Sequence, residues 1–205
     1  MKLKQLERDL SGLEGFEKPS SHREQYTTPP DLAARLLYHA YMRGDIGGRR
    51  VCDLGSGTGI LAIGAALLGA SSVTGVEIDP DAIAVAALNA ARKGVSPVFI
   101  QGDINDPGLV DRVGPMDTVV MNPPFGAQNP HADRPFVNAA LVIAPVTYGI
   151  FNRGSLSFLK GFVEGRAEIE GVIQGTLPLK RQFFFHRRDR KEIPVEIVIL
   201  RRFDR

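Results

Sequence analysis

The chain has 205 residues, of which 43% are hydrophobic and 23% charged, and its formal net charge is +2. This composition is typical of one soluble globular domain with a sizeable core, and it excludes a molecule that binds polyanions over its whole surface. No apolar run approaches the roughly 20 residues of a membrane helix, so we expect no membrane partner and a cytoplasmic location. The single cysteine, Cys52, excludes an internal disulfide and a cysteine-clustered zinc site, and we predict no metal site.

The predicted elements begin with two helices, at 1–14, where leucines share one face, and at 31–43. Strands are expected at 50–54, 73–78, 98–101, 117–121, 146–151, 168–177 and 195–202, and helices at 60–68, 80–93, 136–143 and 155–163. This alternation predicts an α/β, Rossmann-like fold, with a seven-stranded, mostly parallel sheet and helices on both faces. The last two strands have no helix between them, so we expect one strand to be antiparallel to its neighbours.

A glycine-rich loop, Asp53-Leu-Gly55-Ser-Gly57-Thr-Gly59, follows the first strand and opens a helix. Glycines let the backbone turn tightly and let a ligand approach closely. The spacing G-x-G-x-G differs from the G-x-G-x-x-G of pyrophosphate sites. The carboxylate of Asp53 would repel a pyrophosphate, whereas it would attract a methionine ammonium or a sulfonium. The loop therefore favours S-adenosyl-L-methionine over a nicotinamide dinucleotide.

Acidic residues follow the next two strands. Glu77 lies about 20 residues after Gly57, the offset at which an acid accepts hydrogen bonds from ribose hydroxyls. Asp103 can accept a hydrogen bond from an adenine amino group, with Ile104 against the ring. Open α/β sheets bind ligands at the carboxyl ends of their strands. Together with the glycine loop, these acids resemble the class I S-adenosylmethionine-dependent methyltransferases.

The fourth strand ends in Asn122-Pro123-Pro124-Phe125. Two prolines can simply end a strand and stiffen a turn. After a methyltransferase-type loop, the tetrad also predicts a site for an amino group on a planar acceptor. The Asn122 carboxamide oxygen and the Pro123 carbonyl can accept the two N–H bonds and direct the nitrogen lone pair at the methyl group. Phe125 can stack on the face of a base, which contributes about 1–3 kcal/mol.

The chain as a whole resembles the methyltransferase-like protein 5 family, archaeal and eukaryotic enzymes that form N(6)-methyladenosine in small-subunit ribosomal RNA. The segments that carry the resemblance are Leu3-Lys-Gln-Leu-Glu, Gly15-Phe-Glu-Lys-Pro19, Glu24-Gln-Tyr-Thr-Thr-Pro29, the glycine loop, Met121-Asn-Pro-Pro-Phe-Gly126, Phe185-His186 and Ile193-Pro-Val-Glu196. It implies a single domain over 1–205, in which a helical extension over 1–45 covers the cofactor site and 46–205 form the Rossmann-like core.

The resemblance also implies roles for individual residues. Gln25 and Thr28 would contact the cofactor from the amino-terminal segment, and Asn122 to Phe125 would hold a flipped adenine. The residues expected to form the rest of the cofactor pocket are Asp53, Gly55, Gly57, Thr58, Ile60, Glu77, Asp103 and Ile104. Because eukaryotic members need a small zinc-binding activator protein that pairs along a sheet edge, an equivalent partner is a further hypothesis.

The segment 180–205 carries nine Lys/Arg residues against four Asp/Glu, a local basic excess typical of either RNA binding or a solvated hairpin. Within it, Phe185, His186, Arg187 and Arg188 are candidate RNA contacts, although a place in the core is the favoured interpretation for the phenylalanine alone.

Three other functions stay open. The acceptor could be the 2-amino group of guanine in RNA or a protein glutamine amide, because these acceptors use a similar tetrad. A non-catalytic RNA-binding factor could also keep the fold, but the intact loop, acids and tetrad argue against it.

Overall fold

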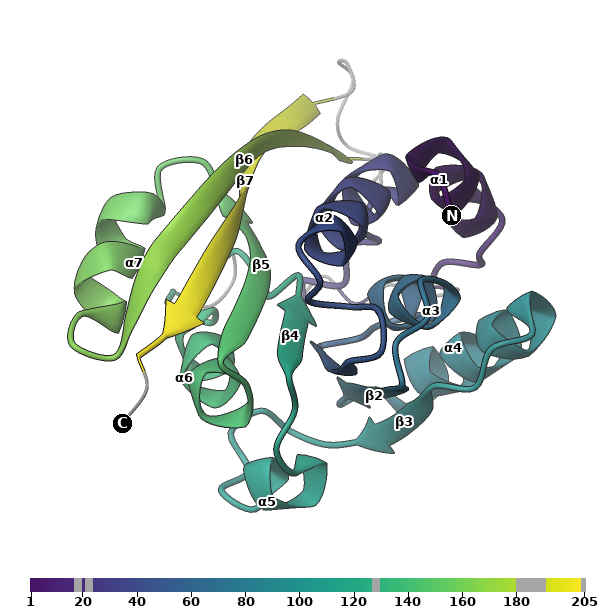
Figure 1. Cartoon of the computed structure of the whole chain (residues 1–205), viewed down its shortest axis with the longest axis horizontal. Coiled ribbons are helices and arrows are strands. Elements are labelled where there is room, and N and C mark those ends of the chain that lie inside the picture. The colour runs from purple at the N-terminus through teal and green to yellow at the C-terminus, as the bar shows by residue number, and fades with distance from the viewer. Residues whose placement is uncertain (17–19, 21–23, 127–129, 180–190, 204–205) are drawn as a thin grey trace.

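The structure is a computed structural model that describes residues 1–205 except 17–19, 21–23, 127–129, 180–190 and 204–205. Seven strands form one sheet in the order β3-β2-β1-β4-β5-β7-β6 (Figure 1). The strands are β1 (Arg50–Leu54), β2 (Ser72–Glu77), β3 (Val98–Gln101), β4 (Thr118–Met121), β5 (Val146–Asn152), β6 (Ala167–Leu179) and β7 (Lys191–Arg202). Among the described residues, β7 runs antiparallel to both of its neighbours, β5 and β6, and the other pairs of neighbouring strands are parallel. The predicted Rossmann-like fold with a seven-stranded, mostly parallel sheet is therefore confirmed.

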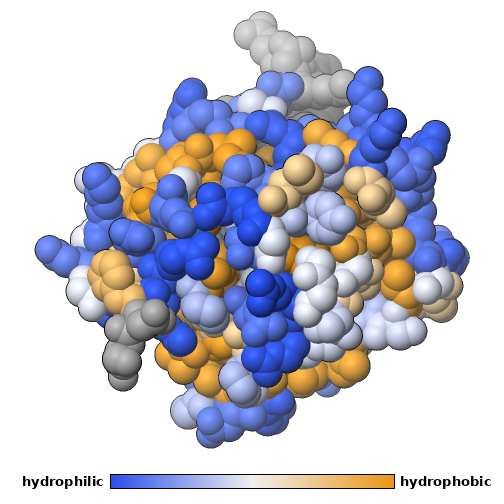
Figure 2. Space-filling model, viewed as in Figure 1, coloured by the Kyte–Doolittle hydropathy of each residue, from blue (hydrophilic) through white to orange (hydrophobic). Residues whose placement is uncertain are grey.

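Helices cover both faces of the sheet. They are α1 (Leu3–Ser11), α2 (Pro30–Met42), α3 (Ile60–Leu67), α4 (Pro80–Lys93), α5 (Leu109–Val113), α6 (Arg134–Ile143) and α7 (Leu156–Val163). One core cluster joins α1, α2 and α3 to one face of the sheet, and a second joins α5, α6 and α7 to the other. Hydrophilic side chains surround several apolar areas on the face seen in Figure 2, as is usual for a folded domain. No helix in the described ranges is long and apolar enough to cross a membrane.

Local sequence signals account for the helix boundaries. In α4, Pro80 occupies the first turn, the Asp79 carboxylate accepts a hydrogen bond from the Asp81 N–H, and Gly94 ends the helix in the left-handed conformation. The short helix α5 was not predicted, because five residues are too few to display helical periodicity. The β6–β7 hairpin is longer than the predicted strands, since antiparallel pairing continues past Pro194, which lies opposite Thr176.

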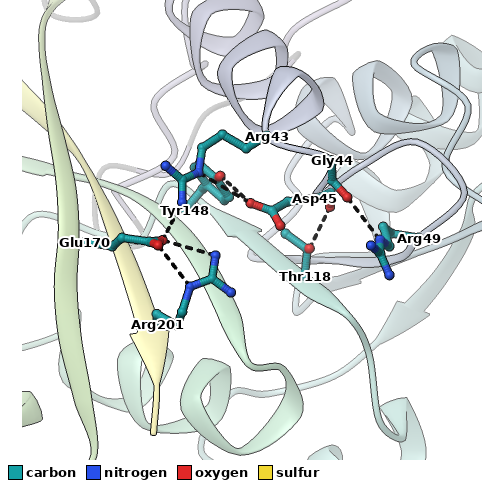
Figure 3. A network of polar contacts seen from close by, with 8 residues as sticks. All are labelled: Arg43, Gly44, Asp45, Arg49, Thr118, Tyr148, Glu170 and Arg201. Carbon is teal, nitrogen blue, oxygen red and sulfur yellow. Dashed lines mark hydrogen bonds and ion pairs between the residues drawn. The ribbon is translucent and has the colours of Figure 1, made fainter.

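The loop between α2 and β1 ties the amino-terminal extension to the sheet (Figure 3). The Tyr148 hydroxyl on β5 donates a hydrogen bond to the Asp45 carboxylate at 2.7 Å. Arg43 contacts Glu170 on β6 at 2.7 Å, and Glu170 also pairs with Arg201 on β7 at 3.1 Å. Burial and the neighbouring Asp45 carboxylate raise the pKa of the Tyr148 phenol, so the hydroxyl keeps its proton and remains a donor at neutral pH.

Candidate active site

A cavity of about 690 Å³ lies at the carboxyl ends of β1, β2, β3 and β4. The strand order reverses between β1 and β4, and open α/β sheets bind their ligands at such a switch point. All the predicted cofactor residues line this cavity, namely Gln25, Thr28, Asp53, Gly55, Gly57, Thr58, Ile60, Glu77, Asp103 and Ile104. Asn122 and Pro124 line it as well, so the structure brings the predicted cofactor residues and the Asn-Pro-Pro turn to one place.

The glycine loop lines the cavity through Gly55 to Thr58, in a conformation that glycine favours. Gly55, Gly57 and Gly59 all have positive φ, at 73°, 52° and 89°. A Cβ on Gly57 would lie 2.9 Å from the ring of Phe16, a residue of the amino-terminal extension. The loop therefore needs glycine for its backbone angles and also for the close approach of Phe16.

Glu77 holds the glycine loop through its carboxylate. One oxygen accepts a hydrogen bond from the Gly57 N–H at 2.8 Å, and the other accepts from the N–H groups of Ile78 and Asp79, both at 2.9 Å. An ionised carboxylate can accept about four hydrogen bonds, so acceptor capacity remains for a ribose hydroxyl. Sequence reasoning predicted the ribose contact but missed that the same carboxylate organises the loop.

Asp53 lies almost completely buried beneath the loop. One carboxylate oxygen accepts a hydrogen bond from the Ala62 N–H in α3 at 2.9 Å, whereas the other has no hydrogen-bond partner within the described part of the chain. Burial raises the pKa of Asp53 to about 7. A buried, unpaired carboxylate oxygen beside a cavity has the chemistry to receive a cationic group such as a methionine ammonium.

Asp103 lies at the exposed rim of the cavity. One of its oxygens accepts hydrogen bonds from the backbone N–H and the side-chain amide of Asn105, at 2.8 and 3.0 Å. Ile104 is half-buried beside it and also lines the cavity. The two residues offer a polar edge and an apolar surface, the combination that an adenine ring requires.

The amide of Asn122 contacts the amino-terminal extension. Its Nδ2 donates a hydrogen bond to the Thr28 hydroxyl at 2.9 Å, while its Oδ1 is buried and has no partner among the described residues. The backbone N–H of Phe125 donates to the Glu24 carboxylate at 2.7 Å. Pro123 and Phe125 do not line the cavity, and the half-buried Phe125 ring packs against the core.

Several residues of this site were not predicted from the sequence. Glu24 is buried, with a positive φ of 48°, and Phe16 and Phe136 also line the cavity. Glu24 belongs to the Glu-Gln-Tyr segment, which was the available signal, but nothing local in the sequence relates it to Phe125. Gln25, in turn, donates from its side chain to the Asp79 carboxylate at 2.7 Å. The predicted RNA contacts Phe185, His186, Arg187 and Arg188 lie outside the described residues.

Comparisons with known proteins agree with this geometry. The family model of ribosomal protein L11 methyltransferase (PrmA) matches residues 35–123. The rRNA N(6)-adenosine-methyltransferase Mettl5 of Drosophila melanogaster is 34% identical, over 96% of this chain and 94% of its own length. Its counterpart METTL5 of Danio rerio is 32% identical, over 97% and 98%. The chain belongs to the METTL5 family.

The METTL5 fold extends to solved structures. The crystal structure of PH1948 from Pyrococcus horikoshii shares 38% identity, covers 98% of both chains and superposes with a TM-score of 0.89. As a methyltransferase of the METTL5 family, this chain uses S-adenosyl-L-methionine. The residues present fit that cofactor, because the open glycine loop and the unpaired, buried oxygen of Asp53 face one cavity. Within the described residues, no group of His, Cys, Asp or Glu side chains is placed to hold a metal ion.

Proposed function

We propose that this chain transfers a methyl group from S-adenosylmethionine to the 6-amino group of an adenosine in RNA, and that the RNA is small-subunit ribosomal RNA. The observation that carries the proposal is the Asn122 carboxamide oxygen, a buried acceptor beside the cavity with no partner among the described residues. The Drosophila melanogaster and Danio rerio relatives are both rRNA N(6)-adenosine methyltransferases, which supports adenosine as the acceptor.

The amino group of adenine is a poor nucleophile because its lone pair is delocalised into the ring. Asn122 Oδ1 and the Pro123 carbonyl would accept its two N–H bonds, hold the base in one plane and direct the lone pair at the methyl carbon. S-adenosylmethionine supplies an electrophilic methyl group on a sulfonium. As the nitrogen gains positive character its proton becomes acidic and can leave to water, so these fixed dipoles suffice without a strong base. Phe125 is our candidate for stacking on the base, which requires its half-buried ring to turn from the core toward the cavity.

The adenine must leave its helix to reach this turn, because its amino group is otherwise paired. Each of the cofactor residues would bind a different part of S-adenosylmethionine. Asp53 would face the methionine ammonium, Glu77 the ribose hydroxyls, and Asp103 with Ile104 the adenine ring. Phe16 and residues 24–28 line the same cavity, which supports our assignment of residues 1–45 as an extension that covers the cofactor.

Two partner contacts belong to the proposal. The basic segment that contains Phe185, His186, Arg187 and Arg188 would contact RNA. A small zinc-binding activator protein would pair along an edge of the sheet; β3 is one such edge, and its Val98 is exposed. Full activity of the purified chain alone, with no complex on co-expression, would remove the activator from the proposal.

The deciding experiment is methylation of small-subunit ribosomal RNA with methyl-labelled cofactor, followed by digestion and identification of the labelled nucleoside. We expect N(6)-methyladenosine. Label on the guanine 2-amino group, or on a protein glutamine, would overturn the adenosine assignment. Asn122→Ala should abolish transfer and leave the cofactor dissociation constant unchanged by calorimetry, because Asn122 belongs to the acceptor side of the cavity. Turnover in that variant would contradict the role given to its amide.

A further inference from the structure

Two buried side chains of the segment 24–28 are hydrogen-bonded to the Asn-Pro-Pro-Phe turn, which lies about a hundred residues later in the sequence. The Thr28 hydroxyl lies 2.9 Å from Asn122 Nδ2, and a Glu24 carboxylate oxygen lies 2.7 Å from the Phe125 N–H. Glu24 and Thr28 are 7% and 6% exposed, so water competes little for either bond. The turn that receives the acceptor base is therefore held at both ends by the amino-terminal extension.

Thr28 fixes the plane of the amide that must receive the base. A carboxamide has an accepting end and a donating end, and only the oxygen can accept from an amino group. With Nδ2 directed at Thr28, the buried Oδ1 is the end without a partner in the described chain. Because the Thr28 hydroxyl can donate as well as accept, it could pair with either end of the amide, and by itself it restrains only the amide plane. The incoming amino group then selects the orientation that presents Oδ1.

Glu24 fixes the other end of the turn. Its carboxylate accepts from the Phe125 N–H, which belongs to the last peptide of the turn, while the rings of Pro123 and Pro124 restrict φ at the two positions before it. Glu24 itself has a φ of 48°, a left-handed conformation that is uncommon for residues other than glycine. An uncommon backbone conformation of this kind, next to a buried side-chain hydrogen bond, is typical of a functional site.

We propose that Thr28 and Glu24 are positioning residues of the methyl acceptor site, which hold Asn122 and the proline turn in the geometry that receives the amino group. This proposal rests on the proposed function. It departs from the role implied by the family resemblance, in which Thr28 contacts the cofactor. The two roles make different predictions for catalysis and for cofactor affinity.

The test compares Thr28→Val, which removes the hydroxyl at nearly constant shape, with Thr28→Ser, which keeps it. The measured quantities are kcat and KM for RNA, and the cofactor dissociation constant by calorimetry. We expect Thr28→Val to lower kcat about 10- to 100-fold, the usual effect of a slightly misplaced reacting group. The cofactor dissociation constant of Thr28→Val should change less than about 2-fold. The kcat of Thr28→Ser should lie within about 3-fold of the unaltered chain, and both changes are much smaller than the loss of kcat expected for Thr28→Val. Thr74→Val, a half-buried change on β2 away from the cavity, serves as the matched control and should leave kcat unchanged.

Glu24 offers a second pair of variants. Glu24→Gln keeps an oxygen that can accept from the Phe125 N–H, whereas Glu24→Leu removes it, so kcat should fall much further in the second. Unchanged kcat in Thr28→Val would overturn the proposal for Thr28, and so would a loss of cofactor affinity as large as the loss of kcat/KM. Equal kcat in the two Glu24 variants would overturn it for Glu24. The nucleoside that the unaltered chain methylates tests the proposed function separately, because the variants are compared on whichever acceptor that chain uses.

Discussion

Asn89 of α4 is hydrogen-bonded to both backbone groups of Glu14, which follows α1. Its Oδ1 accepts from the Glu14 N–H and its Nδ2 donates to the Glu14 carbonyl, each at 2.9 Å. The same Nδ2 donates to the carbonyl of Thr58 at 3.0 Å. One fully buried amide therefore joins the amino-terminal extension, the glycine loop and α4.

Replacing this amide should be costly. We expect Asn89→Ala to lower the free energy of unfolding by about 3 kcal/mol, because three hydrogen bonds are lost and the carbonyl of the buried Thr58 loses this partner. Urea unfolding followed by circular dichroism measures the change. Asn138→Ala, on the exposed face of α6, is the control and should alter stability by less than about 1 kcal/mol. Equal stabilities of the two variants would show that the Asn89 bonds contribute nothing net.

The glycine loop permits a matched pair of substitutions. Gly57→Ala places a methyl group 2.9 Å from Phe16 at a φ of 52°, so the loop must shift and cofactor affinity should fall at least about 10-fold. Gly94→Ala has a similar φ of 67° but no atom within 4 Å of the new Cβ. The control should lose about 1 kcal/mol of stability and keep its cofactor affinity, both measured on the purified variants. Equal losses of affinity would mean that the contact with Phe16 is irrelevant.

Asp53 should make the unliganded chain less stable as pH rises from about 4 to 7. Burial raises its pKa from the ordinary 3.8 to about 7, so in this range the folded chain retains a proton that the unfolded chain has released. Above pH 7 the effect levels off. Asp53→Asn keeps an acceptor for the Ala62 N–H but removes the titration, so its stability relative to the unaltered chain should increase with pH.

Unfolding in urea at pH 5, 6, 7 and 8 measures that difference. Asp117→Asn is the control, because hydrogen bonds from Arg50 lower the pKa of Asp117 below its ordinary value of 3.8. The stability that this carboxylate contributes is therefore lost only at a pH below the range of the experiment. Its offset should be constant from pH 5 to 8. A constant offset for Asp53→Asn as well would contradict the raised pKa.

Tyr148→Phe should destabilise the chain without changing the chemistry. The substitution removes the donor to Asp45 in the network of Figure 3, at a cost of about 1–3 kcal/mol. Neither Tyr148 nor Asp45 lines the cavity, so kcat at a temperature well below the melting transition should stay the same. Thermal melting and initial rates on one preparation test both statements. A fall in kcat in fully folded protein would connect this network to the active site.

The sequence predicted the parts of the fold and site that have a local signature. Strand and helix alternation identified the sheet, and the glycine loop and Glu77 pointed to the cavity because each follows a strand. The contacts of Thr28 with Asn122 and of Glu24 with Phe125 could not be predicted, because they join residues about a hundred positions apart. Such contacts depend on tertiary packing, whereas periodic patterns in a sequence indicate only its helices and strands. The short α5 was missed for the opposite reason, because it is too local to form a pattern.

The segment 24–28 contacts the turn through Glu24 and Thr28, while Gln25 between them donates to Asp79, next to the carboxylate proposed for the ribose. The sites proposed for the methyl donor and the methyl acceptor thus share one short stretch of backbone, through which their binding free energies can be coupled. Thermodynamic linkage then requires reciprocity: whatever factor the donor adds to the affinity for RNA, RNA adds to the affinity for the donor.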